Sequence, residues 1–451
     1  MHLVTALLYV RILAAALPPA AETLTFDDAI AQASQRNLDL QSAQARLSQA
    51  NETARKVWAA YLPQIGVGGS NTRNSVQAKI TLPVAYAVRN TGVNVPPAND
   101  PASAGLPGDP TTYSLVPYQF QTVTVQPYNQ FAAQAQLNQA LIYPALWPAI
   151  RNAYLAERVA ALSTENVRIE ILFSVAQMYY GAASLRESLG VQQRLLQINI
   201  DHEADAQRRF DAGAATKLEV LRAQIDRKTF EQDVVRTQNA YLSAKSGLAA
   251  LLDREPDFEV ARPVEPQLSN QSEVRPDVRT SRASLELAQG TRRGVWYQYA
   301  PSLGVNGTYR LSNFTGFTGR YDSWSVTLAL NWTLWEGGLR ESALRENAAK
   351  VVEASANLRA IDLKARDEVR RARLDLESAR ANHTKAEETL QLARQTSDLV
   401  KTNYANGAAT YLQVADANAS LLNAELNAIG ETLNAQLAIL KLNKANGTFH
   451  P

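Results

Sequence analysis

The sequence repeats itself, and this internal duplication limits the folds open to the chain more than any other feature does. Residues 36–69 align without gaps on residues 274–307, and further matches recur later in the same order. Agreement at several places in one order indicates a tandem duplication of a single structural unit. The first set of matches pairs Arg55, Val57, Trp58, Tyr61, Pro63, Gly66, Val67 and Gly69 with Arg293, Val295, Trp296, Tyr299, Pro301, Gly304, Val305 and Gly307.

Two short motifs extend the repeat. Gly213-Ala214-Ala215-Thr216 recurs as Gly407-Ala408-Ala409-Thr410, and Leu137-Asn138 recurs as Leu330-Asn331. We therefore expect each half to contain a helix, two strands and then two long helices. The expected boundaries are a signal peptide at 1–21, a first repeat at 22–252, a linker at 253–273, a second repeat at 274–447 and a tail at 448–451.

Strands are predicted where apolar and small polar residues alternate. In the second half the apolar positions are Leu303, Val305, Tyr309 and Leu311, then Trp324, Val326, Leu328, Leu330 and Trp332. In the first half they are Ile65 and Val67, then Phe131, Ala133, Ala135 and Leu137. A period of two with one apolar face predicts half-exposed strands. A transmembrane β-barrel and a soluble sandwich both satisfy this pattern.

Long helices are predicted to follow the strands. Neither glycine nor proline occurs from Leu339 to Asn406, so this segment predicts one helix about 100 Å long. Its apolar positions follow steps of three and four with frequent alanine, which is typical of close helix-on-helix contact. Second helices at 214–252 and 408–446 would complete a helical hairpin in each half. A soluble coiled-coil assembly protein is the alternative.

Composition excludes several classes of function. The chain has no cysteine, so it has no disulfide, thiol nucleophile or zinc-thiolate site. A net charge of +2, from 45 basic and 43 acidic residues, gives no electrostatic footprint for nucleic acid. Its four histidines are far apart in the sequence, and no P-loop, nucleophile elbow or spaced set of metal ligands occurs. We therefore expect no cofactor, no metal and no enzymatic activity.

The amino-terminal residues predict export. The stretch from Leu3 to Leu17 is apolar apart from Arg11, and small residues at Ala20 and Ala21 follow it. This pattern is typical of a secretory signal peptide, with a disordered start as the alternative. No later segment offers about 18 uninterrupted apolar residues for a membrane-spanning helix.

Several motifs together carry a family resemblance. They are Arg275-Pro276-Asp277-Val278 at the start of a helix, Pro301 and Gly304 at a strand entry, Leu334-Trp335-Glu336-Gly337-Gly338 at a strand exit, and the two Gly-Ala-Ala-Thr turns. With these motifs in duplicate, the chain resembles the TolC family of outer-membrane efflux proteins over nearly its whole mature length. The resemblance implies a mainly α fold with transmembrane β, in which three tandem-repeat chains share a TolC-like α-barrel and a 12-stranded β-barrel.

The function implied by the resemblance is an outer-membrane exit duct for small molecules or proteins that extends into the periplasm. The implied partners are two further copies in a homotrimer, outer-membrane lipid, a periplasmic adaptor (membrane fusion) protein and an inner-membrane efflux or secretion transporter. That transporter would supply the energy for transport.

The resemblance also implies site residues at the periplasmic tip. Glu219 and Tyr404 occupy places that resemble an inter-helix latch, and Asp416 stands where an acidic constriction ring is expected. Gln413 occupies the place of a second acidic ring, a departure that argues against a doubly acidic gate. A solvated helix face is the alternative for Glu219 and Asp416. The turn residues expected to meet the adaptor are Gly213, Ala214, Thr216, Gly407, Ala408 and Thr410.

The first strand pair is longer than the second. Pro63 and Asn138 are 75 positions apart whereas Pro301 and Asn331 are 30 apart, an excess of 45 residues by subtraction. The excess, at about 75–128, is rich in Pro, Asn and Gly, as the longer outer loops of membrane barrels are. We expect it to be an extracellular loop that shields or narrows the exit.

Overall fold

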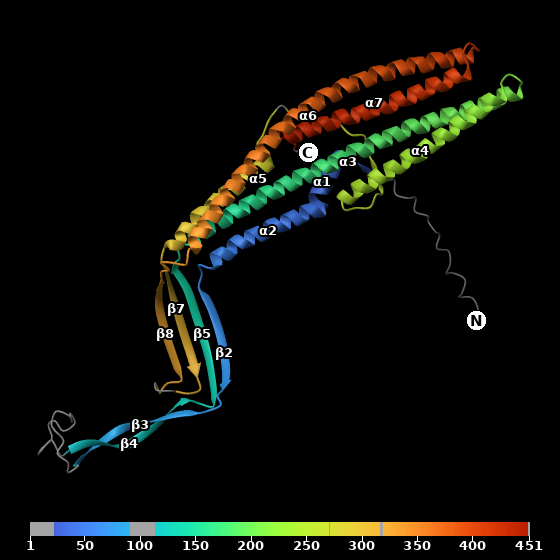
Figure 1. The fold of residues 1–451 in the computed structure, drawn as a ribbon. Helices are drawn as coiled ribbons and strands as arrows, with labels where there is room; N and C mark the ends of the chain where they lie inside the picture. The colour runs from blue at the N-terminus through green and yellow to red at the C-terminus, as the bar shows by residue number, and fades with distance from the viewer. Residues whose placement is uncertain (1–21, 91–112, 270, 316–318, 450–451) are drawn as a thin grey trace, which may run out of the picture. The chain divides into compact units, whose positions relative to one another are not determined.

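The computed structural model describes residues 22–90, 113–269, 271–315 and 319–449, which form two compact units (Figure 1). Of the described residues, the helical unit contains those within 22–53, 152–290 and 346–449, and the strand unit contains those within 54–151 and 291–345. The predicted signal peptide at 1–21 lies outside the described residues.

Four long helices make up most of the helical unit. α3 (Leu146–Asp211) and α6 (Leu339–Ala405) contain 66 and 67 residues, and α4 (Lys217–Leu251) and α7 (Tyr411–Ala445) contain 35 each. The unbroken helix predicted after Leu339 is therefore confirmed. The predicted starts of the second helices, at 214 and 408, were three residues early, because a turn and a capping threonine occupy those positions.

Shorter helices precede the strands in each half. α1 (Phe26–Arg36) and α2 (Leu38–Ala59) lie in the first half, and α5 (Pro276–Trp296) with a 3-10 turn at Tyr297–Tyr299 lies in the second. α5 begins at Pro276. Proline has no backbone N–H, but a residue in the first turn of a helix does not use this donor in a helical hydrogen bond. No helix in the described part of the chain is both long enough and apolar enough to cross a membrane.

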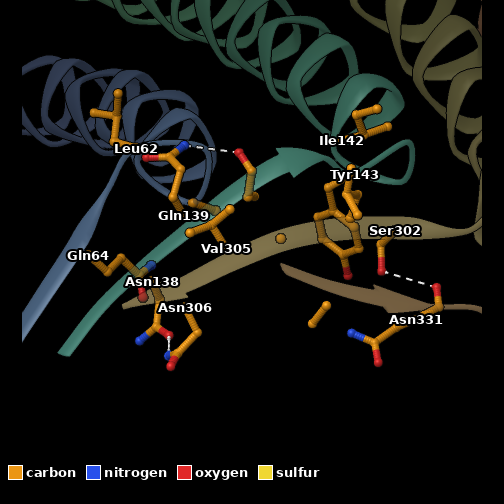
Figure 2. Close-up of a pocket in the computed structure, with 15 residues that line it drawn as sticks. Leu62, Gln64, Asn138, Gln139, Ile142, Tyr143, Ser302, Val305, Asn306 and Asn331 are labelled. Carbon is orange, nitrogen blue, oxygen red and sulfur yellow. Dashed lines mark hydrogen bonds between the residues drawn. The ribbon is translucent and has the colours of Figure 1, made fainter. Parts of the chain in front are cut away.

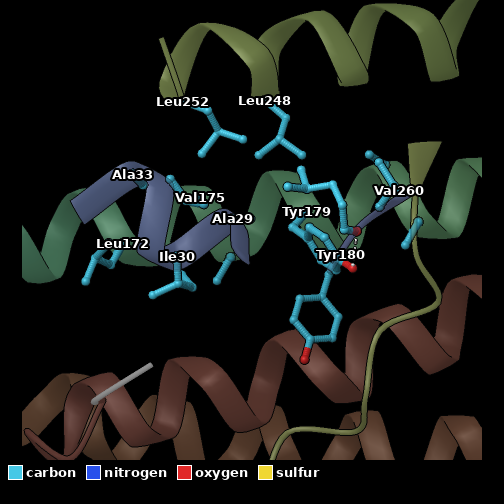
Figure 3. Packing of buried hydrophobic residues seen from close by; sticks show 14 of the residues in the cluster. Ala29, Ile30, Ala33, Leu172, Val175, Tyr179, Tyr180, Leu248, Leu252 and Val260 are labelled. Carbon is cyan, nitrogen blue, oxygen red and sulfur yellow. Dashed lines mark hydrogen bonds between the residues drawn. The ribbon is translucent and has the colours of Figure 1, made fainter. Parts of the chain in front are cut away.

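The main core of the helical unit surrounds a small parallel strand pair. β1 (Glu22–Leu24) pairs with β6 (Phe258–Val260), and the buried side chains around them come from α1, α3 and the end of α4 (Figure 3). The Tyr179 hydroxyl donates to the carbonyl oxygens of Leu24 and Ala261, at 3.2 and 3.1 Å. The segment 253–273, expected to be a linker, therefore contributes a strand to the core.

Glu259 of β6 joins this strand pair to two long helices. Its carboxylate accepts a hydrogen bond from the Tyr241 hydroxyl at 2.7 Å and forms ion pairs with Arg186 and Lys245, each at 3.6 Å. Burial, together with the bond to Glu259, raises the pKa of Tyr241 to about 12. The tyrosine therefore remains a hydrogen-bond donor throughout the physiological pH range.

The strand unit contains an open four-stranded antiparallel sheet. β2 (Gln64–Arg73), β5 (Asn129–Ile142), β7 (Ser302–Ser312) and β8 (Asp322–Asn331) lie in the order β2-β5-β7-β8. The strands predicted from alternation are confirmed. β2 and β8 are the two edges of this sheet, and each pairs on one side only among the described residues.

The register gives the sheet one polar face and one apolar face. Asn138 lies between Gln64 and Asn306, and the next row along the same face contains Gln136 and Thr308. On the opposite face Val67, Ala135, Tyr309 and Trp324 are in register. Val67 is 82% exposed and Trp324 is 74% exposed, so no part of the described chain covers this apolar face.

Amides and other polar groups lie together at the end of the sheet nearest the chain's helical connections. A pocket of about 380 Å³ there is lined by Gln64, Asn138, Asn306 and Asn331 among others (Figure 2). The Asn306 side-chain amide donates to the Asn138 side-chain oxygen, and the Ser302 hydroxyl donates to the Asn331 carbonyl oxygen at 3.4 Å. This end of the sheet therefore offers water a surface rich in hydrogen-bonding groups.

The insertion at 75–128, which we expect to be an extracellular loop, contains two strands. β3 (Ala78–Asn90) and β4 (Tyr113–Gln126) form a separate antiparallel two-stranded ribbon that continues from β2 and β5 (Figure 1). Pro83 and Pro117 lie within these strands, and register shifts occur between Pro83 and Tyr86. The remainder of the insertion, 91–112, lies outside the described residues.

Candidate functional site at the helical hairpin ends

The duplicated Gly-Ala-Ala-Thr motif forms the turn at the end of each helical hairpin. Gly213 and Gly407 have φ angles of 74° and 73°, in the left-handed region where only glycine is free of strain. The Ala214 N–H donates to the Arg209 carbonyl oxygen at 2.7 Å, and the Ala408 N–H donates to the Asn403 carbonyl oxygen at 2.8 Å. Both turns are therefore Schellman motifs that close the preceding long helix.

The threonine of each motif starts the next helix. The Thr216 hydroxyl accepts from the Glu219 N–H at 3.3 Å, and the Thr410 hydroxyl accepts from the Gln413 N–H at 3.4 Å. The Gln413 side chain also accepts from the Thr410 N–H at 2.8 Å and completes a capping box. Gln413, which occupies the place expected for a second acidic ring, thus caps the amino-terminal end of α7.

Tyr404 joins the two hairpins near their ends. The Arg209 guanidinium of α3 lies over the ring of Tyr404 of α6, 4.6 Å from its centre. Asp205 holds this arginine through an ion pair at 2.9 Å. Burial raises the pKa of the Tyr404 hydroxyl above its usual value, and the nearby carboxylates of Asp205 and Glu219 add to this effect.

The other predicted site residues lie around this contact. Glu219 is half-buried in the first turn of α4, close enough to act on Tyr404 electrostatically, but no hydrogen bond joins these two described residues. Gln413 and Asp416 are exposed on α7. The structure thus brings Glu219 and Tyr404 into one neighbourhood and leaves Asp416 facing solvent in the single chain.

Tyr411 makes a second inter-hairpin contact, which the sequence analysis did not predict. Its buried hydroxyl donates to the Asp226 carboxylate of α4 at 3.0 Å, and its ring packs with Ala206, Val220 and Ala223. Burial and Asp226 raise the pKa of Tyr411, so it remains protonated. One sequence feature could have indicated this contact. The repeat departs from itself here, because Lys217 and not a tyrosine follows the threonine of the first turn.

An ion-pair cluster joins the same helices further from the ends. Glu425 of α7 lies 3.7 Å from Arg194 of α3 and 3.4 Å from Arg394 of α6. Its side chain is only 14% exposed, but the side chains of Arg194 and Arg394 are 66% and 60% exposed, so each pair contributes about 0–1 kcal/mol, as surface ion pairs do. The Arg194 pair thus joins the first hairpin to α7 of the second, and the Arg394 pair joins the two helices of the second hairpin to each other.

Polar groups without partners are buried in the same stretch of the hairpins. The Ser397 hydroxyl of α6 and the Asn418 side-chain oxygen of α7 have no hydrogen-bond partner in the described structure, although these residues are 1% and 2% exposed. Burial without a partner costs about 1–3 kcal/mol for such a group. The packing of the helices around Ser397 and Asn418 is therefore less stable than it would be without these unpartnered polar groups.

His202 adds a titratable group to this region. It lies on α3, half-buried, and both burial and the Lys401 ammonium of α6 lower its pKa, while Asp205 and Asp201 oppose this shift. No group of three or more His, Cys, Asp or Glu side chains in the described chain could hold a metal ion. The arrangement offers packing and charge pairs rather than reactive groups.

Comparison with known proteins relates the chain to one protein family. The outer membrane efflux protein family matches residues 29–254 and 268–448. No curated protein sequence matches the chain.

Solved structures of low sequence identity share the fold. The outer membrane protein VceC of Vibrio cholerae is similar at 21% identity and a TM-score of 0.70, over 94% of this chain and 97% of VceC. A membrane protein from Pseudomonas aeruginosa is similar at 17% identity and 0.71, over 95% and 91%. The CmeC outer membrane channel of Campylobacter jejuni is similar at 15% identity and 0.71, over 94% and 86%.

The fold is thus that of TolC-like outer membrane channels, a mainly helical chain with strands for a β-barrel. Since the family match covers most of both halves, the chain belongs to the outer membrane efflux proteins, channel-forming proteins of the outer membrane that extend into the periplasm.

Proposed function

We propose that the chain is one protomer of a homotrimeric exit duct that works with an inner-membrane efflux or secretion transporter and a periplasmic adaptor. Three chains would contribute four strands each to one β-barrel, and their helical hairpins would surround a common tunnel. Small molecules or proteins would leave through it, and the transporter would supply the energy.

The open sheet with its exposed apolar face is the observation that carries this proposal. Its edges, β2 and β8, present unpaired backbone groups, which lipid cannot satisfy. Pairing β8 of one chain with β2 of the next removes every edge after three copies. The apolar face, with Val67 and Trp324, then meets lipid, and the polar face, with Gln136 and Asn138, lines the lumen.

The hairpin ends are proposed as the gate and the adaptor contact. Tyr404 and Glu219 would hold the hairpins together in the closed state, and Asp416 with Gln413 would face the lumen as rings of three. Gly213, Ala214, Thr216, Gly407, Ala408 and Thr410 would meet the adaptor. The exposed position of Asp416 fits such a ring, because a lumen-facing side chain in a trimer is exposed in one chain.

The soluble coiled-coil alternative does not account for the sheet. A soluble protein would leave the apolar side chains of β8 in water, including Trp324, Val326, Leu328 and Leu330, all more than 60% exposed. Exposed apolar patches of this kind mark interaction or membrane surfaces.

Mass measurement of the detergent-solubilised protein tests the duct. We expect a trimer that dissociates on heating in detergent and that forms ion-conducting pores in planar bilayers. A stable monomer, or a protein that remains soluble without detergent, would contradict the proposal. Co-purification after crosslinking in the native membrane would then identify the adaptor and the transporter.

A further inference from the structure

The β3–β4 ribbon is a structure that cannot be stable alone. An isolated two-stranded hairpin is marginally stable at best in water. In the described chain β3 pairs only with β4, so both outer edges of the ribbon offer unpaired backbone groups. Edges of this length normally require a partner or protective charges.

The register brings apolar side chains together on one face of the ribbon near its start. Ile80 is paired with Val123, and Leu82, two residues further along the same face, is paired with Gln121. Thr81 and Thr122 are paired on the opposite face, where their hydroxyls are 3.1 Å apart. Pro83 and Phe120 are paired two residues further along that opposite face. Ile80, Leu82 and Phe120 are 43%, 40% and 60% exposed, so the described chain covers neither face of the ribbon.

Charge argues for another copy of the chain, and against the phosphates of membrane lipid, as the cover. Lys79 and Arg89 are the only charged residues in β3, and β4 has none. Two cations do not make a phosphate-binding surface, and the edges carry almost none of the charges that prevent strand pairing. Such edges suit pairing with strands of the same kind.

We propose that the ribbons of three copies pair edge to edge, β3 of one chain with β4 of the next, to form a six-stranded collar. This inference rests on the proposed trimer, because β3 continues from β2, an edge that the trimer would pair. Head-to-tail contacts of this kind close into a ring after three copies. Ile80, Leu82 and Val123 of each chain then meet on the axis.

The collar is narrower than the barrel below it. With strands about 4.8 Å apart and tilted by about 40°, a ring of six has a radius of about 6 Å and a ring of twelve about 12 Å. Ile80, Leu82 and Val123 supply nine apolar side chains near the axis, against three from Gln121 on the same face. In a ring this narrow they form a hydrophobic constriction, which limits the passage of water and ions by dewetting.

Distances between spin labels test the collar in the intact trimer. The chain has no cysteine, so Thr81→Cys labels the ribbon uniquely and Val326→Cys labels the barrel as a matched control. Both labels point away from the axis, so the distance between copies is expected to be about 10 Å shorter at Thr81 than at Val326. Double electron–electron resonance measures both.

The control separates the two proposals. Absence of any distance between copies at Val326 would overturn the trimer and the collar with it. A normal distance at Val326 with an equal or longer one at Thr81 would overturn the collar alone.

A second measurement tests the constriction. In a Tyr404→Leu background, chosen so that the hairpin ends limit the current less, Ile80→Ser with Val123→Ser should raise single-channel conductance at least twofold. The matched variant Thr81→Ser with Thr122→Ser, on the opposite face of the same ribbon, should leave it unchanged. Equal conductance in both variants would overturn the constriction.

Discussion

At the scale of single residues, the two hairpin turns differ where the duplication has diverged. Thr216 is followed by Lys217, and Thr410 by Tyr411, which reaches across to Asp226. The sequence repeat identified the two turns, and the family resemblance implied that Glu219 and Tyr404 form a latch there. The sequence could not predict Tyr411 with Asp226, or Tyr404 with Arg209, because the stagger of one hairpin against the other depends on tertiary packing.

Tyr411→Phe should loosen the closed hairpin ends. The variant keeps the ring and removes one hydrogen bond to a carboxylate, which contributes about 1.5 kcal/mol. Three copies act together, so we expect more frequent openings in single-channel recordings. Tyr241→Phe, which removes the corresponding bond to Glu259 in the distant core, should leave the openings unchanged. Identical records for the two variants would remove Tyr411 from the gate.

Variants of the predicted latch and of the predicted acidic ring should have different effects in the same recordings. Glu219→Ala with Tyr404→Leu removes contacts proposed for the closed state, including the stacking with Arg209 that contributes about 0.5–1 kcal/mol, and should raise conductance. Asp416→Ala should instead lower cation selectivity, because three carboxylates at a constriction concentrate cations. Unchanged values in both variants would assign these residues to an ordinary solvated helix face.

His202 should make the hairpin contact sensitive to acid. Because its folded pKa lies below the ordinary value, the neutral ring is favoured in the packed state. This contribution to stability is fully present above about pH 6.5 and is lost as pH falls through the lowered pKa, where a second cation forms beside Lys401. We expect His202→Gln, but not His383→Gln, to reduce the fall in trimer melting temperature between pH 7.5 and 5.

At the scale of elements, the sequence predicted most accurately the helices and strands that depend on local residue patterns. The helix from Leu339 was predictable because no glycine or proline interrupts it, and the barrel strands because their alternation is regular. The pair β1–β6 was not predicted, because strands of three residues are too short to show an alternation of apolar and polar residues. The strands β3 and β4 inside the expected loop were not predicted, because Pro83 and Pro117 lower the strand signal, whereas pairing between the two strands overrides it.

Gly407→Ala should loosen the turn between α6 and α7. Its φ of 73° costs a residue with a Cβ about 1 kcal/mol. Gly430→Ala, inside α7 with nothing within 4 Å of the added methyl, should instead stabilise its helix by about 0.5–1 kcal/mol. Hydrogen exchange at residues 405–413 should become about fivefold faster in the first variant only. Equal exchange in both would mean that the turn does not depend on glycine.

At the scale of the whole molecule, the sheet is the part that one chain cannot complete. Its register places neighbouring residues of β8 on opposite faces, with Val326 on the apolar side and Thr327 in register with Asn306. The residues predicted to face lipid could therefore be read from the alternation. Which edges meet depends on the strand order, which the sequence alone did not contain.

Val326→Arg and Thr327→Arg should have opposite consequences. An arginine facing lipid near the middle of the bilayer costs about 2–4 kcal/mol per chain, so Val326→Arg should lower the temperature at which the trimer dissociates in detergent. Thr327→Arg should assemble normally and reduce cation conductance. Equal loss of the trimer in both variants would contradict the assignment of the two faces.

The pairing of β1 with β6 has a consequence for biogenesis. A chain exported from its amino terminus delivers Glu22–Leu24 first, yet their partner strand ends at Val260, more than halfway along the 451 residues. Until then the core around Leu24 and the apolar face of α1 is incomplete, because β6 and α7, which contribute to it, have not yet been exported. We therefore expect the newly exported chain to be most exposed to proteases and aggregation before β6 has emerged.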